Sequence, residues 1–314
     1  MAKITVVGAG FVGRTTAVRI AESNLADVCL LDVIEGWPQG LAMDIRHSAP
    51  IQGIRASVVG TNDYADSAGS DIVVITAGMP RGPGMSRMDL LEKNAGIVGS
   101  VCDQVKQTSP DAVVIVVTNP LDEMTFLAAE RTGFPRARVM GMAGILDSAR
   151  LAVNIAEELG VSPLGVKAMT LGSHGEQMVP LPRQATVDGR PLEDLVDAPT
   201  LQKLFNRTRA GGAEIVGLLQ KGSAFYAPSA ASAQMCRAIL SGSGEVLPVC
   251  AWVTGEYGIP DVYLGVPARL GRGGVEEIVE LELNPDELAQ LTQAADAIRG
   301  RCADLAKIGS TAGG

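Results

Sequence analysis

Only two histidines occur among the 314 residues, and one of them, His174, lies in a glycine-rich stretch. Histidine is the side chain whose ordinary pKa lies nearest neutral pH, so it suits reversible proton transfer. Gly172 and Gly175 flank the ring and leave room for close approach of the backbone or of a ligand. Taken alone, the stretch is interpreted either as a proton-transfer site or as an ordinary histidine-bearing loop.

Four charged side chains are candidates to accompany such a histidine. Asp147 and Arg150 are three residues apart in a helical stretch, so they share one helix face. An exposed pair of this kind contributes little to stability, but the apolar neighbours favour partial burial. Arg81 and Arg87 lie in a segment rich in proline and glycine that follows a strand, where a closing lid is common. Each arginine can bind a carboxylate, although a solvated basic loop is the simpler explanation for that segment alone.

A glycine motif near the start of the chain indicates a dinucleotide site. The run at 3–7 is typical of a buried parallel strand, and Gly8, Gly10 and Gly13 then precede a helical stretch that reaches about residue 22. A second strand at 28–31 ends at Asp32. The glycines permit a tight turn and close contact with a pyrophosphate, the helix start favours its charge, and the acid binds ribose hydroxyls.

Other predicted strand ends lie at the same edge of the sheet. Thr76, Ala77 and Gly78 end a strand at 71–76 and should border the cofactor, because ligands of doubly wound sheets lie beyond the carboxyl ends of the strands. Asn119 follows a strand at 112–117 and can both donate and accept hydrogen bonds there. A turn residue before proline is an equally good interpretation of Asn119.

The order of the elements predicts the fold class: α/β, with an N-terminal Rossmann doubly wound parallel sheet and a C-terminal α+β substrate domain. We expect a dinucleotide-binding domain at 1–143 and a substrate domain at 144–314. The remaining expected elements are strands at 56–59, 139–144, 245–254, 261–270 and 275–281, a hairpin at 185–190, helices at 88–107, 145–159, 198–219, 229–241 and 284–306, and a frayed tail from 308.

Composition excludes several other classes of protein. The net charge of −9 argues against a nucleic-acid partner, and no apolar run is long enough to cross a bilayer. The start of the chain has no signal-peptide pattern. Five scattered cysteines without a C-x-x-C motif, and two distant histidines, predict reduced thiols, a cytoplasmic protein and no metal site.

Together these motifs resemble those of the lactate/malate dehydrogenase superfamily, in particular its lactate-dehydrogenase-like malate dehydrogenases. The resemblance extends from about residue 4 to residue 306, in consistent order. It rests on the glycine motif at 8–13, Asp32, the turn at 76–78, Arg81, Arg87, the stretch 118–122, the stretch 146–150 and His174.

The resemblance implies roles for individual residues. His174 would exchange the proton of the substrate hydroxyl, Asp147 would hold its ring, and Arg150 would bind the C1 carboxylate. Arg87 would polarise the carbonyl, and Arg81 would face a second carboxylate. Asn119 would contact both substrate and nicotinamide ribose. The implied contacts with NAD are Gly8, Gly10, Phe11, Val12, Gly13, Asp32, Thr76, Ala77, Gly78, Asn94, Val117 and Asn119.

The sequence therefore predicts NAD-dependent interconversion of malate and oxaloacetate by a homotetramer or homodimer. Arg81 favours a dicarboxylate over lactate, but the small residue Ala224, in a segment implied to line the pocket, leaves room for another 2-hydroxy acid. A non-catalytic NAD-binding protein would not need the His174–Asp147 pair or the arginines. Neither nucleic acid nor membrane is an expected partner.

Overall fold

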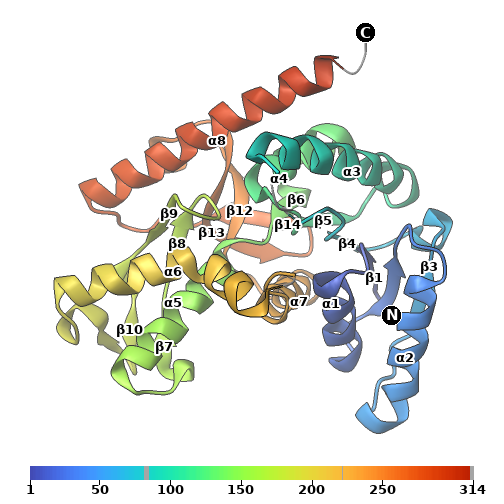
Figure 1. Cartoon of the computed structure of the whole chain (residues 1–314), viewed down its shortest axis with the longest axis horizontal. Helices are drawn as coiled ribbons and strands as arrows, with labels where there is room; N and C mark the ends of the chain where they lie inside the picture. Colours follow the sequence, from blue (N-terminus) through green and yellow to red (C-terminus); the bar gives the residue numbers. More distant parts are fainter. Residues whose placement is uncertain (81–84, 221, 312–314) are drawn as a thin grey trace.

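The computed structural model describes residues 1–80, 85–220 and 222–311, without the side chains of Arg87 and of residues 306–311 (Figure 1). The longer helices are α1 (Phe11–Glu22), α2 (Trp37–Gln52), α3 (Arg87–Thr108), α4 (Leu121–Thr132), α5 (Gly144–Leu159), α6 (Ala198–Leu219), α7 (Tyr226–Ser241) and α8 (Pro285–Thr311). The strands are β1 (Lys3–Val7), β2 (Asp27–Leu31), β3 (Val58–Thr61), β4 (Ile72–Ile75), β5 (Val113–Val116), β6 (Val139–Gly141), β7 (Val166–Lys167), β8 (Thr170–Gly172), β9 (Met178–Pro180), β10 (Thr186–Val187), β11 (Arg190–Pro191), β12 (Glu245–Val253), β13 (Val262–Gly271) and β14 (Gly274–Ile278).

The N-terminal half is a parallel sheet with strand order β3-β2-β1-β4-β5-β6. Its central strands β4 and β5 are continuous runs of valine and isoleucine, and every residue of both is buried. Such runs are typical of parallel strands that helices cover on both faces. The predicted doubly wound sheet is confirmed.

The sheet continues without a break into the C-terminal half. β12 pairs antiparallel with β6 through Cys250 and Gly141, and β13, β8 and β9 extend the sheet beyond β12. Among the described residues this makes one eleven-stranded sheet, with β14 paired to β13. A separate three-stranded sheet of β11, β10 and β7 contains the predicted hairpin. The C-terminal half is thus α+β, as predicted, although it shares its main sheet with the N-terminal half.

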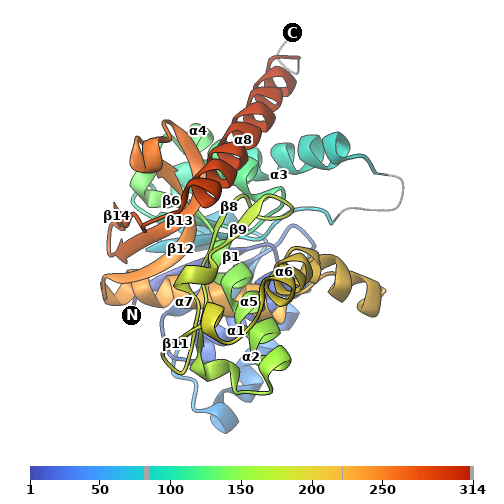
Figure 2. The same ribbon diagram turned by 90° about the vertical axis from the view of Figure 1, so that its left-hand side faces the viewer.

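The helices join the two halves on both faces of the sheet. Helix α7 of the C-terminal half packs against α1, and Ser229 Oγ donates a hydrogen bond to Val12 O at 3.0 Å. Helices α5 and α6 pack on each other, and α8 crosses the β8–β9 hairpin and ends beyond the rest of the molecule (Figures 1 and 2). In the described part of the chain, no helix is long and apolar enough to cross a membrane.

Three predicted helix boundaries differ from those of the structure. The expected tail from residue 308 continues α8 as far as Thr311, because extending an existing helix requires only one residue to be fixed for each new hydrogen bond. Helix α7 begins at Tyr226 rather than 229, with Pro228 in its first turn, where a missing N–H costs nothing. Helix α3 begins at Arg87, since Ser86 and Asp89 form a capping box in which each side chain accepts the other's backbone N–H.

Candidate active site

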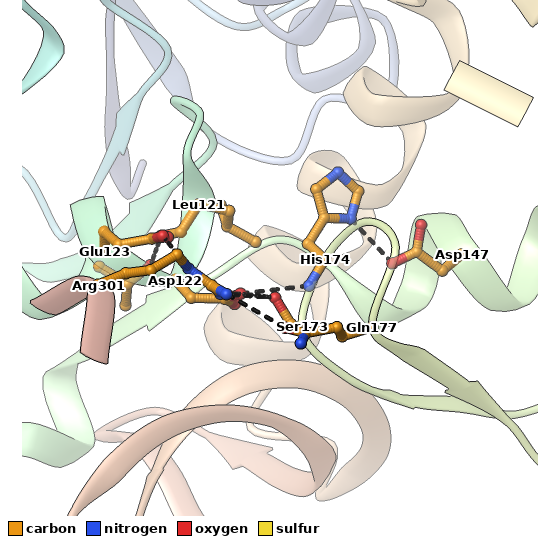
Figure 3. Close-up of polar contacts among 9 residues, drawn as sticks. Leu121, Asp122, Glu123, Asp147, Ser173, His174, Gln177 and Arg301 are labelled. Carbon is orange, nitrogen blue, oxygen red and sulfur yellow. Dashed lines mark hydrogen bonds and ion pairs between the residues drawn. The ribbon is translucent and has the colours of Figure 1, made fainter. Parts of the chain in front are cut away.

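His174 lies in the turn between β8 and β9, and its ring is held by Asp147 from α5. Nδ1 of His174 lies 2.8 Å from Asp147 Oδ2, while the second ring nitrogen points away from the carboxylate (Figure 3). Only 15% of the histidine side chain and 3% of the aspartate side chain are exposed. Asp147 therefore fixes both the orientation of the ring and the nitrogen that carries a proton, and Nε2 is left for other partners.

The same carboxylate holds Arg150. Arg150 Nη1 lies 3.3 Å from Asp147 Oδ1, and the pair is mostly buried rather than exposed, as the apolar neighbours in the sequence predicted. Burial alone would lower the pKa of His174. The charge and hydrogen bond of Asp147, together with the charge of Asp122, outweigh it, and they raise the pKa of His174 above 6.5 even though Arg150 lowers it.

A second carboxylate lies on the backbone side of His174. Oδ2 of Asp122, in the first turn of α4, accepts hydrogen bonds from Ser173 Oγ at 2.6 Å and from His174 N at 3.3 Å (Figure 3). Arg301 of α8 lies against this group and pairs with Glu123. Both acids are buried, at 1% and 2% exposed.

The glycine motif forms a cradle that has no room for side chains at Gly8 and Gly13. A Cβ at Gly13 would lie 1.8 Å from Gly8 O, and one at Gly8, whose φ is +98°, would lie 2.6 Å from Ala77 N. At the end of β2, Asp32 Oδ2 accepts from Ala9 N at 2.6 Å and Oδ1 accepts from Ile34 N at 3.0 Å. The turn, the helix start and the acid therefore have the arrangement that a dinucleotide needs.

Two adjoining cavities connect this cradle to His174. The first, about 260 Å³, is lined by Gly10, Phe11, Val12, Gly13, Thr76, Gly78, Met79, Pro80, Val117, Thr118, Asn119, Gly222 and Ser223. The second, about 540 Å³, is lined by Val12, Val117, Asn119, Met142, Leu146, Arg150, His174, Gly175, Met178, Arg209, Gly212, Ala213, Val216, Ser223, Ala224 and Pro228. Because four residues line both, a ligand bound along the cradle reaches the histidine.

The predicted site residues are only partly brought together by the described structure. His174, Arg150 and Asn119 line the larger cavity, with Asp147 directly behind them. Asn119 also precedes a cis peptide bond to Pro120. Arg81 lies outside the described residues, and of Arg87 only the backbone is described, as the first residue of α3.

Asn94 and Gly172 each make a structural contact in the described part of the chain. Asn94 is buried behind the turn, where Oδ1 accepts from Met79 N and Nδ2 donates to Met79 O and to Asn119 O. It holds two strand ends together and does not line either cavity. Gly172 gives room to the backbone, not to a ligand, since a Cβ there would lie 2.7 Å from Gln177 O.

Sequence reasoning missed several residues of the site. Arg209 of α6 lines the larger cavity, and its Nη2 donates to Met178 O at 3.4 Å. Burial lowers the pKa of Arg209, and none of the described carboxylates forms an ion pair with it. Asp122 was noted only within a motif, and Arg301 lies far along the chain. No local pattern identifies either residue, because their meeting depends on the packing of α8 against α4.

The fold and the site define a two-part Rossmann-type oxidoreductase in which a histidine–carboxylate pair lies beside a dinucleotide cradle. Residues 2–141 match the family model of the lactate/malate dehydrogenase NAD-binding domain, and residues 145–307 match that of the alpha/beta C-terminal domain of the same family. The chain belongs to the lactate/malate dehydrogenase family, which confirms the resemblance seen in the sequence.

Individual relatives are similar over nearly the whole chain. A malate dehydrogenase of Nostoc punctiforme is 56% identical over 95% of this chain and 91% of its own length. The structure of malate dehydrogenase from Salinibacter ruber has 47% identity and a TM-score of 0.95, covering 99% of both chains. A lactate dehydrogenase of Cryptosporidium parvum, solved with lactic acid and NAD, has 40% identity and a TM-score of 0.93, covering 97% of this chain and 98% of its own.

We expect NAD to be strongly preferred over NADP. Asp32 ends β2 and is followed by the exposed apolar residues Val33 and Ile34. A 2′-phosphate on the adenine ribose would meet a carboxylate and no basic side chain there. Initial rates with NADH and NADPH at matched oxaloacetate concentrations measure the preference, and comparable kcat/KM for the two cofactors would contradict it.

Proposed function

We propose that this protein catalyses the NAD-dependent interconversion of (S)-malate and oxaloacetate. The observation that carries the proposal is Asp147, a buried carboxylate that holds both a histidine and an arginine at the wall of a cavity continuous with the dinucleotide cradle. A protein that merely binds NAD has no use for a proton donor and a carboxylate-binding guanidinium on one buried acid. Among the described residues, no group of three or more histidine, cysteine or acidic side chains is placed to hold a metal ion.

The cradle residues fit NAD, which supplies the hydride chemistry when it is bound. Arg150 binds the C1 carboxylate through its planar guanidinium and fixes the substrate beside His174. In oxaloacetate reduction, protonated His174 donates through Nε2 to the oxygen that becomes the hydroxyl, and in malate oxidation the neutral ring removes that proton. Asp147 stabilises the imidazolium and keeps a proton on Nδ1, which donates a hydrogen bond to the Asp147 carboxylate. Arg87 stabilises the negative charge that develops on the oxygen.

The choice of a dicarboxylate rests on Arg81, which, by the resemblance to the family, would face the distal carboxylate of the substrate. Lactate dehydrogenase activity is the second candidate, and two observations favour keeping it. Ala224 leaves space in the larger cavity, and the lactate dehydrogenase of Cryptosporidium parvum shares the fold at 40% identity. Initial rates with oxaloacetate, pyruvate and 2-oxoisocaproate, each with NADH, decide the matter: a preference for pyruvate would overturn the malate assignment.

The raised pKa of His174 predicts opposite pH dependences for the two directions. Oxaloacetate reduction needs the imidazolium, so its kcat/KM should fall as pH rises through the pKa of His174, above 6.5. Malate oxidation needs the neutral ring, so its kcat/KM should fall as pH decreases through the same pKa. Profiles measured in both directions test this, and Asp147→Asn should move the transition to lower pH. Equal pH dependence in both directions would show that His174 is not the shared group.

Three further properties belong to the proposal. We infer that residues 1–143 bind the dinucleotide and residues 144–314 supply the substrate side, with Arg81, Arg87 and Asn119 as the exceptions. A cytoplasmic location is supported by five buried cysteines, none of them in a disulfide. A homotetramer or homodimer is supported by large apolar side chains exposed on α2, of which Trp37, Met43 and Ile51 are 43%, 50% and 82% exposed.

A further inference from the structure

His174 is held from two sides, and only one of them belongs to the usual proton-transfer pair. Asp147 binds the ring, whereas Asp122 binds the backbone N–H of His174 and the hydroxyl of the preceding Ser173. Between them the two carboxylates fix both ends of the histidine (Figure 3). The hydrogen bond to the backbone N–H fixes the position of the His174 main chain, from which the side chain extends. The hydrogen bond to Nδ1 fixes only the orientation of the ring.

The second side depends on a single side chain from the end of the chain. The guanidinium of Arg301 donates to Ser173 Oγ at 3.0 Å and to Gln177 Oε1 at 3.1 Å, and Nη2 lies 3.8 Å from Asp122 Oδ2. Its Nε also pairs with Glu123. Ser173 and Gln177 belong to the histidine turn, and Asp122 and Glu123 belong to α4. Arg301 therefore links the turn to the helix through all three nitrogens of its planar guanidinium.

Arg301 supplies a positive charge beside two buried carboxylates, Asp122 and Glu123. Burial and the neighbouring Glu123 raise the pKa of Asp122 to about 6, while the Ser173 hydroxyl, His174 and Arg301 lower it. Two carboxylates buried side by side need a cation if both are to stay ionised. The thiols of Cys250 on β12 and Cys302 on α8 complete the surroundings of Asp122, and neither supplies a positive charge.

We propose that Arg301 is a positioning residue for His174. Together with Asp122 and Ser173 it forms a cluster, the α8 clamp, that fixes how far the imidazole extends into the cavity. Arg301 does not line the cavity with the histidine, so it acts only through the turn. This inference rests on the proposed function, because the position of His174 affects the reaction only if His174 transfers the proton.

The chain offers a direct measurement of this clamp. The only other histidine is His47, exposed on α2, so His47→Gln leaves His174 as the single imidazole signal in NMR spectra. In that background, Arg301→Gln is compared with Arg299→Gln, a matched control on the same helix whose hydrogen bonds within the described part of the chain go to Pro260 and Asp296. The pKa of His174 is read by NMR titration without ligands, and kcat and KM for oxaloacetate are measured with NADH.

We expect Arg301→Gln to lower kcat at least about tenfold with KM changed less than about threefold, since one misplaced catalytic group affects the chemical step more than binding. The pKa of His174 should fall, because Asp122 without its cation takes up a proton and no longer supports the imidazolium. Among the described side chains, the other charges near the ring are Asp147 and Arg150 of α5, and Arg209, which lines the same cavity. The Arg299→Gln protein should keep wild-type values of both quantities.

Two milder variants keep the test open if Arg301→Gln does not fold. Arg301→Lys retains the charge but not the fork, so it should preserve the pKa of His174 and restore kcat only in part. Ser173→Ala removes the hydroxyl that links Arg301 to Asp122, and it should lower kcat several-fold without exposing a charge. If Arg301→Gln and Ser173→Ala both match Arg299→Gln in pKa and kcat, the clamp has no positioning role. A wild-type protein inactive on oxaloacetate would instead refute the proposed function, while the NMR titration would still test the clamp.

Discussion

Replacing His174 with glutamine should lower kcat for oxaloacetate reduction by about 10²- to 10⁴-fold, the usual contribution of a general acid or base. Glutamine keeps a polar side chain of similar reach but cannot deliver a proton at neutral pH. Binding of NADH should remain within a few-fold of wild type, because the glycine cradle and Asp32 lie in another part of the site. Steady-state kinetics and a fluorescence titration with NADH measure the two quantities separately.

The chain provides a matched control for this substitution. His47→Gln makes the same chemical change at an exposed position of α2 and should leave kcat unchanged. A His174→Gln protein whose kcat stays within about tenfold of wild type would show that another group carries the proton. Loss of NADH affinity together with kcat would indicate damage to the fold, and the thermal unfolding midpoint of both variants checks for it.

Replacing Arg81 with glutamine should shift the preference from oxaloacetate toward pyruvate by at least about 10³-fold in the ratio of kcat/KM values. If Arg81 faces the distal carboxylate, as the proposed function requires, it gains a charge-assisted bond of about 1.5–3 kcal/mol with oxaloacetate, and with pyruvate it is left beside a methyl group at a greater cost. The two effects act on different substrates, so they add in the ratio, and each 1.36 kcal/mol is about tenfold. The measurement is kcat/KM for both substrates in both proteins.

Two other arginines make this test decisive. Arg150→Gln should harm both substrates alike, because both carry the C1 carboxylate that Arg150 is proposed to bind. Arg209 is a half-buried cation in the larger cavity, without an ion-pair partner among the described carboxylates. If Arg81→Gln changes the ratio less than about fivefold and Arg209→Gln changes it strongly, the distal carboxylate lies against α6 and not against the segment that contains Arg81.

The sequence was sufficient for those parts of the fold that follow from local patterns. Buried valine and isoleucine runs predicted β4 and β5, and the glycine spacing predicted the cradle, since both arise from neighbours along the chain. It could not predict that β6 and β12 join the two halves into one sheet. That pairing involves a three-residue strand with a single paired position, which has no periodicity of its own.

The site divides in the same way. The pair Asp147 and Arg150 could be predicted because they lie three positions apart on one helix, and their apolar neighbours indicated burial. Asp122 and Arg301 are 179 positions apart in the chain, one more than the 178 between Glu123 and Arg301, and no local pattern in either stretch predicts the other. The proton-transfer role of His174 could thus be predicted from local sequence. The contacts that hold its backbone could not, because they form only when α8 packs against α4.

The shared sheet also has a consequence for the order in which the molecule can be made. During synthesis the N-terminal half emerges first, and its last strand β6 pairs with β5 on one edge only, because β12, its partner on the other edge, leaves the ribosome about a hundred residues later. An unpaired strand edge is prone to pair with other chains, and contacts between distant residues form slowly. The nascent N-terminal half therefore exposes an unpaired edge of β6. We expect the chain to be most prone to aggregation before synthesis of its C-terminal half is complete.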